Sequence, residues 1–241
     1  MKKGKLLLSA LLLAILLAGC SQESEQDAQP AQTPEITSGT VPKRATAGTD
    51  DQKKSSGGTN GNVLIAYFSV PEAVGVDAVA RASRVVEDGE VVGNTQFVAE
   101  TIQQETGGEI FRIETVQEYP GDHDELVDFG ENELAEDARP DLKNQIENLE
   151  NYDTIFIGYP VWAGDLPMPL YTLLESTDFS GKTIIPFSTH GGSGFSGTIG
   201  TLEDLQPDAT INTNGLTVSR EDVSESREDI VQWVNSLSVK Q

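Results

Sequence analysis

The stretch TIIPFSTHGGSGFSG, residues 183–197, decides the fold. Its first five residues, 183–187, form a continuous apolar run, which indicates a strand buried on both faces, as in a parallel sheet. Four glycines follow between positions 191 and 197, directly before a predicted helix at 197–205. Glycine allows a backbone to approach a flat ligand closely, so we interpret this loop as part of a binding site.

The same alternation of apolar runs and helical patterns continues on both sides of this stretch. The predicted strands are 62–68, 110–113, 154–158 and 183–187, with a fifth at 209–211 or, more favoured, at 216–218. The predicted helices are 95–106, 124–137, 142–149, 169–174, 197–205 and 223–237. This order predicts an α/β three-layer sandwich, with a five-stranded parallel sheet and helices on both of its faces.

A long insertion separates the first strand from its helix. It spans residues 70–92, whereas about 2–6 residues usually connect such elements. The segments 84–86 and 90–92 flank an Asp-Gly pair, which predicts a β-hairpin with a tight turn. The insertion is either a lid over a site or a decoration, and its position after a strand favours a lid.

The ligand of an open α/β sheet lies outside the carboxyl ends of its strands. The first strand ends at Ser69, and the helix after the insertion begins with Gly93, Asn94, Thr95 and Gln96. Free backbone N–H groups and hydroxyls at a helix N-terminus bind an anion without any cationic side chain, which points to a monophosphate. The alternative for Asn94 and Thr95 is a plain helix cap.

Two further loops follow predicted strands. Tyr159-Pro160-Val161-Trp162-Ala163-Gly164 follows the third strand, and Thr189-His190-Gly191-Gly192-Ser193-Gly194 follows the fourth. The flat face of a loop tryptophan can cover an aromatic ligand, or the ring can fold back on the core.

Together the three loops resemble those of the flavodoxin family over residues 62–238, although the insertion splits the usual continuous first loop. The resemblance implies noncovalent FMN, and the chain has no Ser-Gly-Ala-Thr acceptor for covalent attachment. It implies that Ser69, Asn94, Thr95 and Gln96, with Gly93, hold the phosphate. It also implies that the flavin ring lies against a second set of residues: Pro160, Val161, Trp162, Ala163, Gly164, Thr189, His190, Gly191, Gly192, Ser193 and Gly194.

Three functions are considered: two follow from the resemblance, and the third belongs to another class of protein. The first is an FMN-binding electron carrier that serves a redox partner protein or a quinone. The second is an FMN-dependent NAD(P)H or quinone reductase, with a substrate pocket under the insertion. The third is a solute-binding lipoprotein without a redox role. The flavin performs the redox chemistry, so no catalytic acid, base or nucleophile is required, and His190 either donates to the ligand or only orients its loop.

Composition excludes several other functions. The net charge of −23 argues against nucleic acid as a partner. The single cysteine, Cys20, excludes an intramolecular disulfide, and with only two histidines a metal site is not expected.

The first residues resemble a bacterial lipoprotein signal. Lysines at positions 2, 3 and 5 precede an apolar run that ends in Leu-Ala-Gly-Cys. We therefore expect a signal peptide at 1–19, a lipidated Cys20 with a disordered linker to residue 61, and a flavodoxin-like domain at 62–241. The protein is then extracytoplasmic and anchored to the bacterial cell membrane by lipid.

Overall fold

A parallel sheet forms the centre of the computed structural model, which describes residues 62–71, 83–237 and 239. Its order is β4-β1-β5-β6, with β7 and β8 both pairing with β6. The strands are β1 (Val63–Tyr67), β4 (Glu109–Arg112), β5 (Thr154–Pro160), β6 (Thr183–His190), β7 (Thr210–Ile211) and β8 (Leu216–Ser219). All of these pairings are parallel, as the continuous apolar runs predict.

The fifth strand position is occupied twice. β7 pairs with the first residues of β6 and β8 with the last, so the two candidates from the sequence together form one interrupted edge strand. Gly215 lies at the interruption, where a Cβ would come within 2.6 Å of both the Phe195 ring and the Pro186 carbonyl oxygen. A side chain there would push the edge strand away from β6, because contacts that short cannot form.

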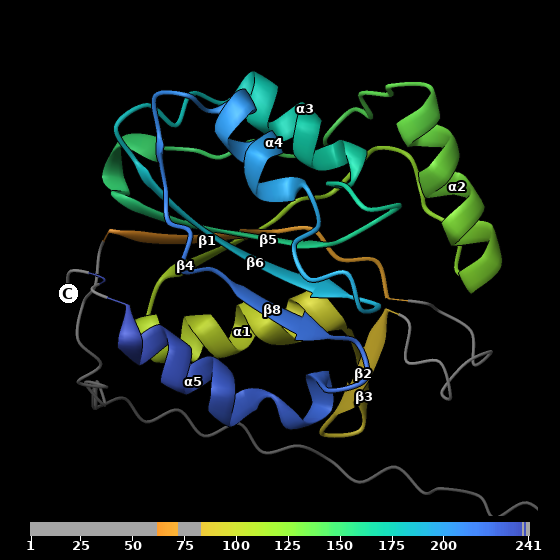
Figure 1. Cartoon of the computed structure of the whole chain (residues 1–241), viewed down its shortest axis with the longest axis horizontal. Coiled ribbons are helices and arrows are strands. Elements are labelled where there is room, and N and C mark those ends of the chain that lie inside the picture. Colours follow the sequence, from red (N-terminus) through yellow and green to blue (C-terminus); the bar gives the residue numbers. More distant parts are fainter. Residues whose placement is uncertain (1–61, 72–82, 238, 240–241) are drawn as a thin grey trace, which may run out of the picture. The chain divides into compact units, whose positions relative to one another are not determined.

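Helices cover both faces of the sheet, as predicted (Figure 1). On one face, α1 and α5 pack in a core with Phe97, Ile102 and Ile230, and on the other α3 and α4 pack with Leu170 and Leu202. The helices are α1 (Asn94–Thr106), α2 (His123–Ala135), α3 (Met168–Ser176), α4 (Thr198–Leu205) and α5 (Arg227–Ser236). Short 3-10 turns lie at Leu149–Asn151 and Val223–Glu225.

The predicted helix at 142–149 is wrong. Leu142 forms an isolated bridge with Thr115, and the Asn144 side chain donates to the Arg112 carbonyl oxygen at the end of β4. Hydrogen bonding to that edge strand holds the segment in a non-helical path. Its apolar residues still pack against the core, so their spacing reflects burial and not helical periodicity.

The predicted hairpin in the insertion is confirmed. β2 (Arg84–Glu87) and β3 (Glu90–Gly93) pair antiparallel around Asp88 and Gly89, whose φ angles are 50° and 86°. Both turn residues therefore adopt left-handed conformations, which the Asp-Gly pair favours. β3 runs directly into α1, and the Asn94 backbone N–H donates to the Ser83 carbonyl oxygen. The hairpin thus fixes the position at which α1 begins.

Predictions about the leader and linker fall on residues 1–61, outside the described residues. The part of the insertion at 72–82 also lies outside them. Within the part of the chain that the structure describes, no helix has both the length and the apolar character needed to cross a bilayer.

Candidate functional site

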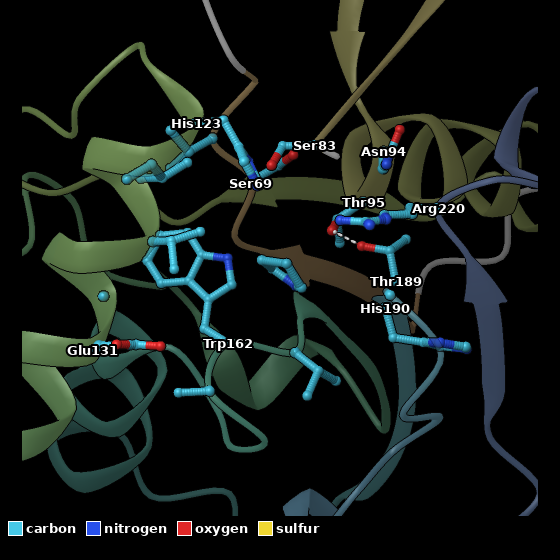
Figure 2. A pocket seen from close by; sticks show the side chains of 18 residues that line it. Ser69, Ser83, Asn94, Thr95, His123, Glu131, Trp162, Thr189, His190 and Arg220 are labelled. Atoms are coloured by element: carbon cyan, nitrogen blue, oxygen red, sulfur yellow. Dashed lines mark hydrogen bonds between the residues drawn. The ribbon is translucent and has the colours of Figure 1, made fainter. Parts of the chain in front are cut away.

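A pocket of about 220 Å³ opens at the carboxyl ends of the strands (Figure 2). Most of the predicted site residues line it, and they come from all three loops. These are Ser69, Asn94, Thr95, Pro160, Val161, Trp162, Ala163, Thr189, His190 and Gly191. The sheet therefore brings together residues that lie more than a hundred positions apart in the sequence.

The split first loop is rejoined in space. Ser69 follows β1, and Gly93 precedes α1, yet a Cβ on Gly93 would lie 2.0 Å from the Ser69 Oγ. The Ser69 side chain occupies the space that any side chain on Gly93 would need. Gly93 is the N-cap of α1 and makes no side-chain hydrogen bond to the first turn. Asn94 is already inside the helix, so it is not the plain N-cap that the sequence allowed.

Two buried hydroxyls connect the start of α1 to the end of β6. The Thr95 Oγ1 and Thr189 Oγ1 atoms are 2.9 Å apart and form a hydrogen bond. Both side chains are almost fully buried and both line the pocket. This bond holds the N-terminus of α1 against the end of β6, so hydroxyls and helical N–H groups converge at one end of the pocket.

A tight turn presents Trp162 to the other side of the pocket. Trp162 and Asp165 exchange backbone hydrogen bonds of 3.1 and 2.8 Å. Between them, Ala163 and Gly164 have φ angles of 48° and 83°, both left-handed. The Asp165 carboxylate accepts hydrogen bonds from the backbone N–H of Leu166 and, at 3.0 Å, from the Tyr171 hydroxyl, and these bonds fix the turn.

The Trp162 ring belongs partly to the core and partly to the pocket. Its edge contacts with Phe68 and Tyr119 have centroid separations of 5.4 and 5.5 Å. On its other side lies Gly130 of α2, where a Cβ would come within 3.0 Å of the indole. These contacts hold the ring in one orientation while it still lines the pocket.

His190 orients its own loop. Its Nδ1 accepts a 2.9 Å hydrogen bond from the Gly192 backbone N–H, at a glycine with φ of 120°. Partial burial lowers the pKa of His190, and the nearby Asp222 carboxylate opposes that effect. The neutral imidazole is the form that can accept at Nδ1, so this hydrogen bond and the lowered pKa agree.

Some predicted residues lie outside the pocket lining. The Gln96 side chain donates to Glu100 in the next turn of α1, at 2.8 Å. Its predicted contact with a phosphate therefore has no support from its side-chain position. The others that do not line the pocket are glycines and a serine: Gly93, Gly164, Gly192, Ser193 and Gly194.

Sequence reasoning missed one wall of the pocket and its cation. The wall is the face of α2 that carries His123, Leu126, Val127, Gly130 and Glu131, and Ser83 also lines the pocket. The cation is Arg220, which directly follows β8. The rule that ligands lie at the carboxyl ends of strands applies to Arg220 as well, so that signal was available.

The arrangement suits a flat aromatic ligand that carries an anionic group. Hydroxyls, helical N–H groups and Arg220 gather at one end, while Trp162, Val161 and Leu126 supply apolar surface. Among the described residues, no group of histidines, cysteines or carboxylates is placed to bind a metal ion.

Comparisons with known proteins agree with this geometry. A sequence profile described as Flavodoxin matches residues 83–237. A flavoprotein structure from Bacteroides uniformis is 27% identical, with a TM-score of 0.57, and the alignment covers 73% of this chain and 99% of that one. No curated protein matches significantly.

Two other solved structures are more distant. A Bacteroides eggerthii flavoprotein is 25% identical over 71% of this chain and 98% of its own, with a TM-score of 0.49. A Lactobacillus acidophilus flavoprotein, solved in complex with FMN, is 20% identical over 68% and 97%, with a TM-score of 0.47. Because the profile covers more than half of the sequence, the chain belongs to the flavodoxin family.

Proposed function

We propose that the protein binds FMN noncovalently and transfers electrons, as a lipid-anchored carrier on the outer side of a bacterial cell membrane. The observation that carries the proposal is the joining of two features in one pocket. One is the Thr95–Thr189 pair at the N-terminus of α1, and the other is the fixed ring of Trp162. Membership of the flavodoxin family and the FMN complex of the Lactobacillus acidophilus flavoprotein are consistent with it.

The residues present fit FMN. Ser69, Thr95 and the N–H groups that follow Asn94 in the first turn of α1 would hold its phosphate, because Gly93 supplies no side-chain cap for them. The Asn94 N–H itself donates to the Ser83 carbonyl oxygen. Trp162 and Val161 would cover its ring system. When bound, FMN supplies one- and two-electron chemistry, and the protein controls its access and surroundings.

Electron transfer of this kind needs no proton donor from the protein. The Nδ1 atom of His190 accepts a hydrogen bond from the Gly192 N–H and so orients its own loop. A carrier, whose partner is a redox protein or a quinone, is consistent with this arrangement. An FMN-dependent NAD(P)H or quinone reductase is the outcome that the test below distinguishes.

The lipid anchor rests on the sequence. Cys20 is the only cysteine, and it follows the positive and apolar leader at the position that a lipoprotein signal requires. Two acyl chains at about 0.8 kcal/mol per buried CH₂ would hold the protein firmly on a membrane. The acidic, proline- and glycine-containing residues up to 61 would serve as a tether.

The flavin test begins with the full chain purified in detergent. Acid precipitation should release a yellow cofactor with the mass of FMN, and the pellet should be colourless. Colour that stays in the pellet would mean covalent attachment, and a colourless chain that FMN cannot load would favour the solute-binding alternative. Steady NAD(P)H oxidation with a quinone and no added protein partner would replace the carrier by a reductase.

The anchor is tested separately, by the mass of the mature protein. Loss of residues 1–19 and a diacylglyceryl addition at the new N-terminus are expected, together with recovery in the membrane fraction. Cys20→Ser should remove the addition. An unmodified chain that is released into the medium would contradict the anchor while leaving FMN binding untouched.

A further inference from the structure

Arg220 is placed in the pocket by the sheet itself. It follows the last residue of β8, and its backbone N–H donates to the His190 carbonyl oxygen at 2.8 Å. This bond continues the β6–β8 pairing beyond the strand, so the Arg220 backbone is held as firmly as a strand residue. Its side chain is half-buried and lines the pocket.

The guanidinium of Arg220 lies close to Gly191 in the loop that follows β6. A Cβ on Gly191 would lie 3.6 Å from both the Cζ and Nε atoms of Arg220 and 3.7 Å from its Nη1. A Cβ at these distances would be in ordinary van der Waals contact with the guanidinium, which places the guanidinium next to this loop. Figure 2 shows the side chain extending toward Thr95 and Thr189, whose hydroxyls form one end of the pocket.

Arg220 differs from Arg139 and Arg227 in its ion pairing. Arg139 pairs with Asp137 and Glu175, and Arg227 pairs with Glu87. Within the described residues, Arg220 is in no such ion pair. The carboxylate that lines the pocket, Glu131, lies beside Trp162, on the far side from Arg220 in Figure 2.

We propose that Arg220 is the cationic anchor for the ligand's phosphate, so that the pocket selects phosphorylated over unphosphorylated flavin. This inference rests on the proposed function and corrects the expectation that neutral donors alone hold the phosphate. Hydrogen bonds between ionised groups are roughly twice as strong as those between neutral groups. A chain with a net charge of −23 repels a phosphate dianion, and a guanidinium in the same pocket as the α1 N-terminus offsets that repulsion locally.

The test compares two flavins that differ only in the phosphate. Dissociation constants for FMN and riboflavin are measured by flavin fluorescence on the full chain in detergent, for the wild type, Arg220→Gln, Arg220→Lys and Lys182→Gln. Lys182 precedes β6 at the opposite end of that strand, so its replacement makes the same change in net charge away from the pocket. Circular dichroism confirms that each variant is folded.

Arg220→Gln should weaken FMN binding by about tenfold to a hundredfold and leave riboflavin binding within about twofold. Arg220→Lys should keep part of the preference, because the charge remains but the planar fork is lost. Lys182→Gln should bind both flavins as the wild type does. Added salt should reduce the difference between the dissociation constants for FMN and riboflavin more in the wild type than in Arg220→Gln.

Several results would overturn the inference. Equal loss of FMN and riboflavin binding in Arg220→Gln would assign Arg220 to the ring or to the fold. A wild type that binds both flavins equally would remove phosphate selection altogether. If folded wild type bound neither flavin, the proposed function would fail, and that result is distinct from a selective failure of Arg220.

Discussion

At the scale of single residues, the contact between Ser69 and Gly93 compensates for the insertion. The insertion separates the two halves of the predicted first loop in the sequence. In the structure they meet, because the Ser69 Oγ lies only 2.0 Å from where a Cβ on Gly93 would be. Gly93→Ala should therefore lower the free energy of unfolding by about 1–3 kcal/mol, as overpacking usually does. Urea denaturation measures this change.

The matched control for Gly93→Ala is the double variant Ser69→Ala, Gly93→Ala. Removing the Ser69 hydroxyl relieves the closest contact, so the double variant should recover part of the lost stability. Additive losses from the two substitutions would show that the two residues do not meet.

Trp162 should determine flavin affinity and fluorescence. Trp162→Ala removes an aromatic surface worth about 0.5–1.5 kcal/mol, so FMN binding should weaken about two- to tenfold with less quenching. Trp162→Phe should keep most of the FMN affinity and most of the fluorescence quenching. Trp233 is the other tryptophan and packs against Phe156 outside the pocket, so Trp233→Phe is the control. Equal effects at Trp162 and Trp233 would rule out a pocket role.

His190 should make stability depend on pH. Because its pKa is lowered in the folded state, the native chain binds fewer protons than the unfolded chain below the ordinary value of 6.5. The contribution of His190 is therefore fully present above pH 6.5 and is lost as pH falls through its folded-state pKa. Urea denaturation at several pH values should show this loss in the wild type.

His190→Asn is the matched variant for this measurement. It can keep an acceptor for the Gly192 N–H but does not titrate, so its stability should change less between pH 7 and 5. Identical pH profiles for the two proteins would contradict the role assigned to His190.

At the scale of elements, a buried carboxylate holds α2 against the segment that connects it to β4. Glu133 is only 7% exposed, and it accepts hydrogen bonds from the Tyr119 hydroxyl, at 3.0 and 3.1 Å, and from the Gln117 side chain. Tyr119 also contacts the Trp162 ring. The wall of the pocket and its tryptophan are therefore joined through one network.

Burial raises the pKa of Glu133, against the opposing effect of its hydrogen bonds. The native state then binds a proton more readily than the unfolded state, whose value is near 4.5. The stability that Glu133 contributes is present below pH 4.5 and is lost as pH rises through its folded-state pKa. Glu133→Gln should lack this loss. The midpoint temperature of thermal unfolding of the wild type should therefore fall relative to that of the variant as pH rises. A constant difference across pH would contradict this.

The elements show what local sequence can predict. α1 ends at Thr106, as predicted, and Gly107 caps it in a left-handed conformation with φ of 67°. The Asp88-Gly89 turn also forms as predicted. Both features depend on only a few neighbouring residues. The helix prediction for 142–149 is wrong because hydrogen bonds to β4, which is far away in sequence, override the helical spacing of its apolar residues. The two edge-strand candidates both form because one long partner, β6, has room for each.

At the scale of the whole molecule, net charge should steer redox reagents. The chain carries 39 acidic and 16 basic residues, so it attracts cations and repels anions over several ångströms. Stopped-flow reduction of FMN-loaded protein by reduced methyl viologen, a cation, should slow as salt is added. Reduction by dithionite, an anion, should accelerate. Rates that change in the same direction with both reagents would contradict electrostatic steering.

The site as a whole was only partly predictable. Loops at strand ends are visible in the sequence, so Trp162 and Thr189 could be identified from position and residue type. The α2 wall enters the pocket through packing between distant elements, which periodicity does not report. Arg220 follows the predicted strand at 216–218, so its place at a strand end was visible in the sequence. Its position beside His190 depends on the pairing of β8 with β6, which only the folded sheet shows.

The central claim is that this pocket binds one FMN. The most direct measurement is a titration of FMN with the flavin-free full chain, followed by flavin fluorescence at constant FMN. We predict saturable quenching that ends at one FMN per chain and is weakened by Trp162→Ala. Fluorescence equal to that of free FMN at every concentration of folded protein would contradict the claim.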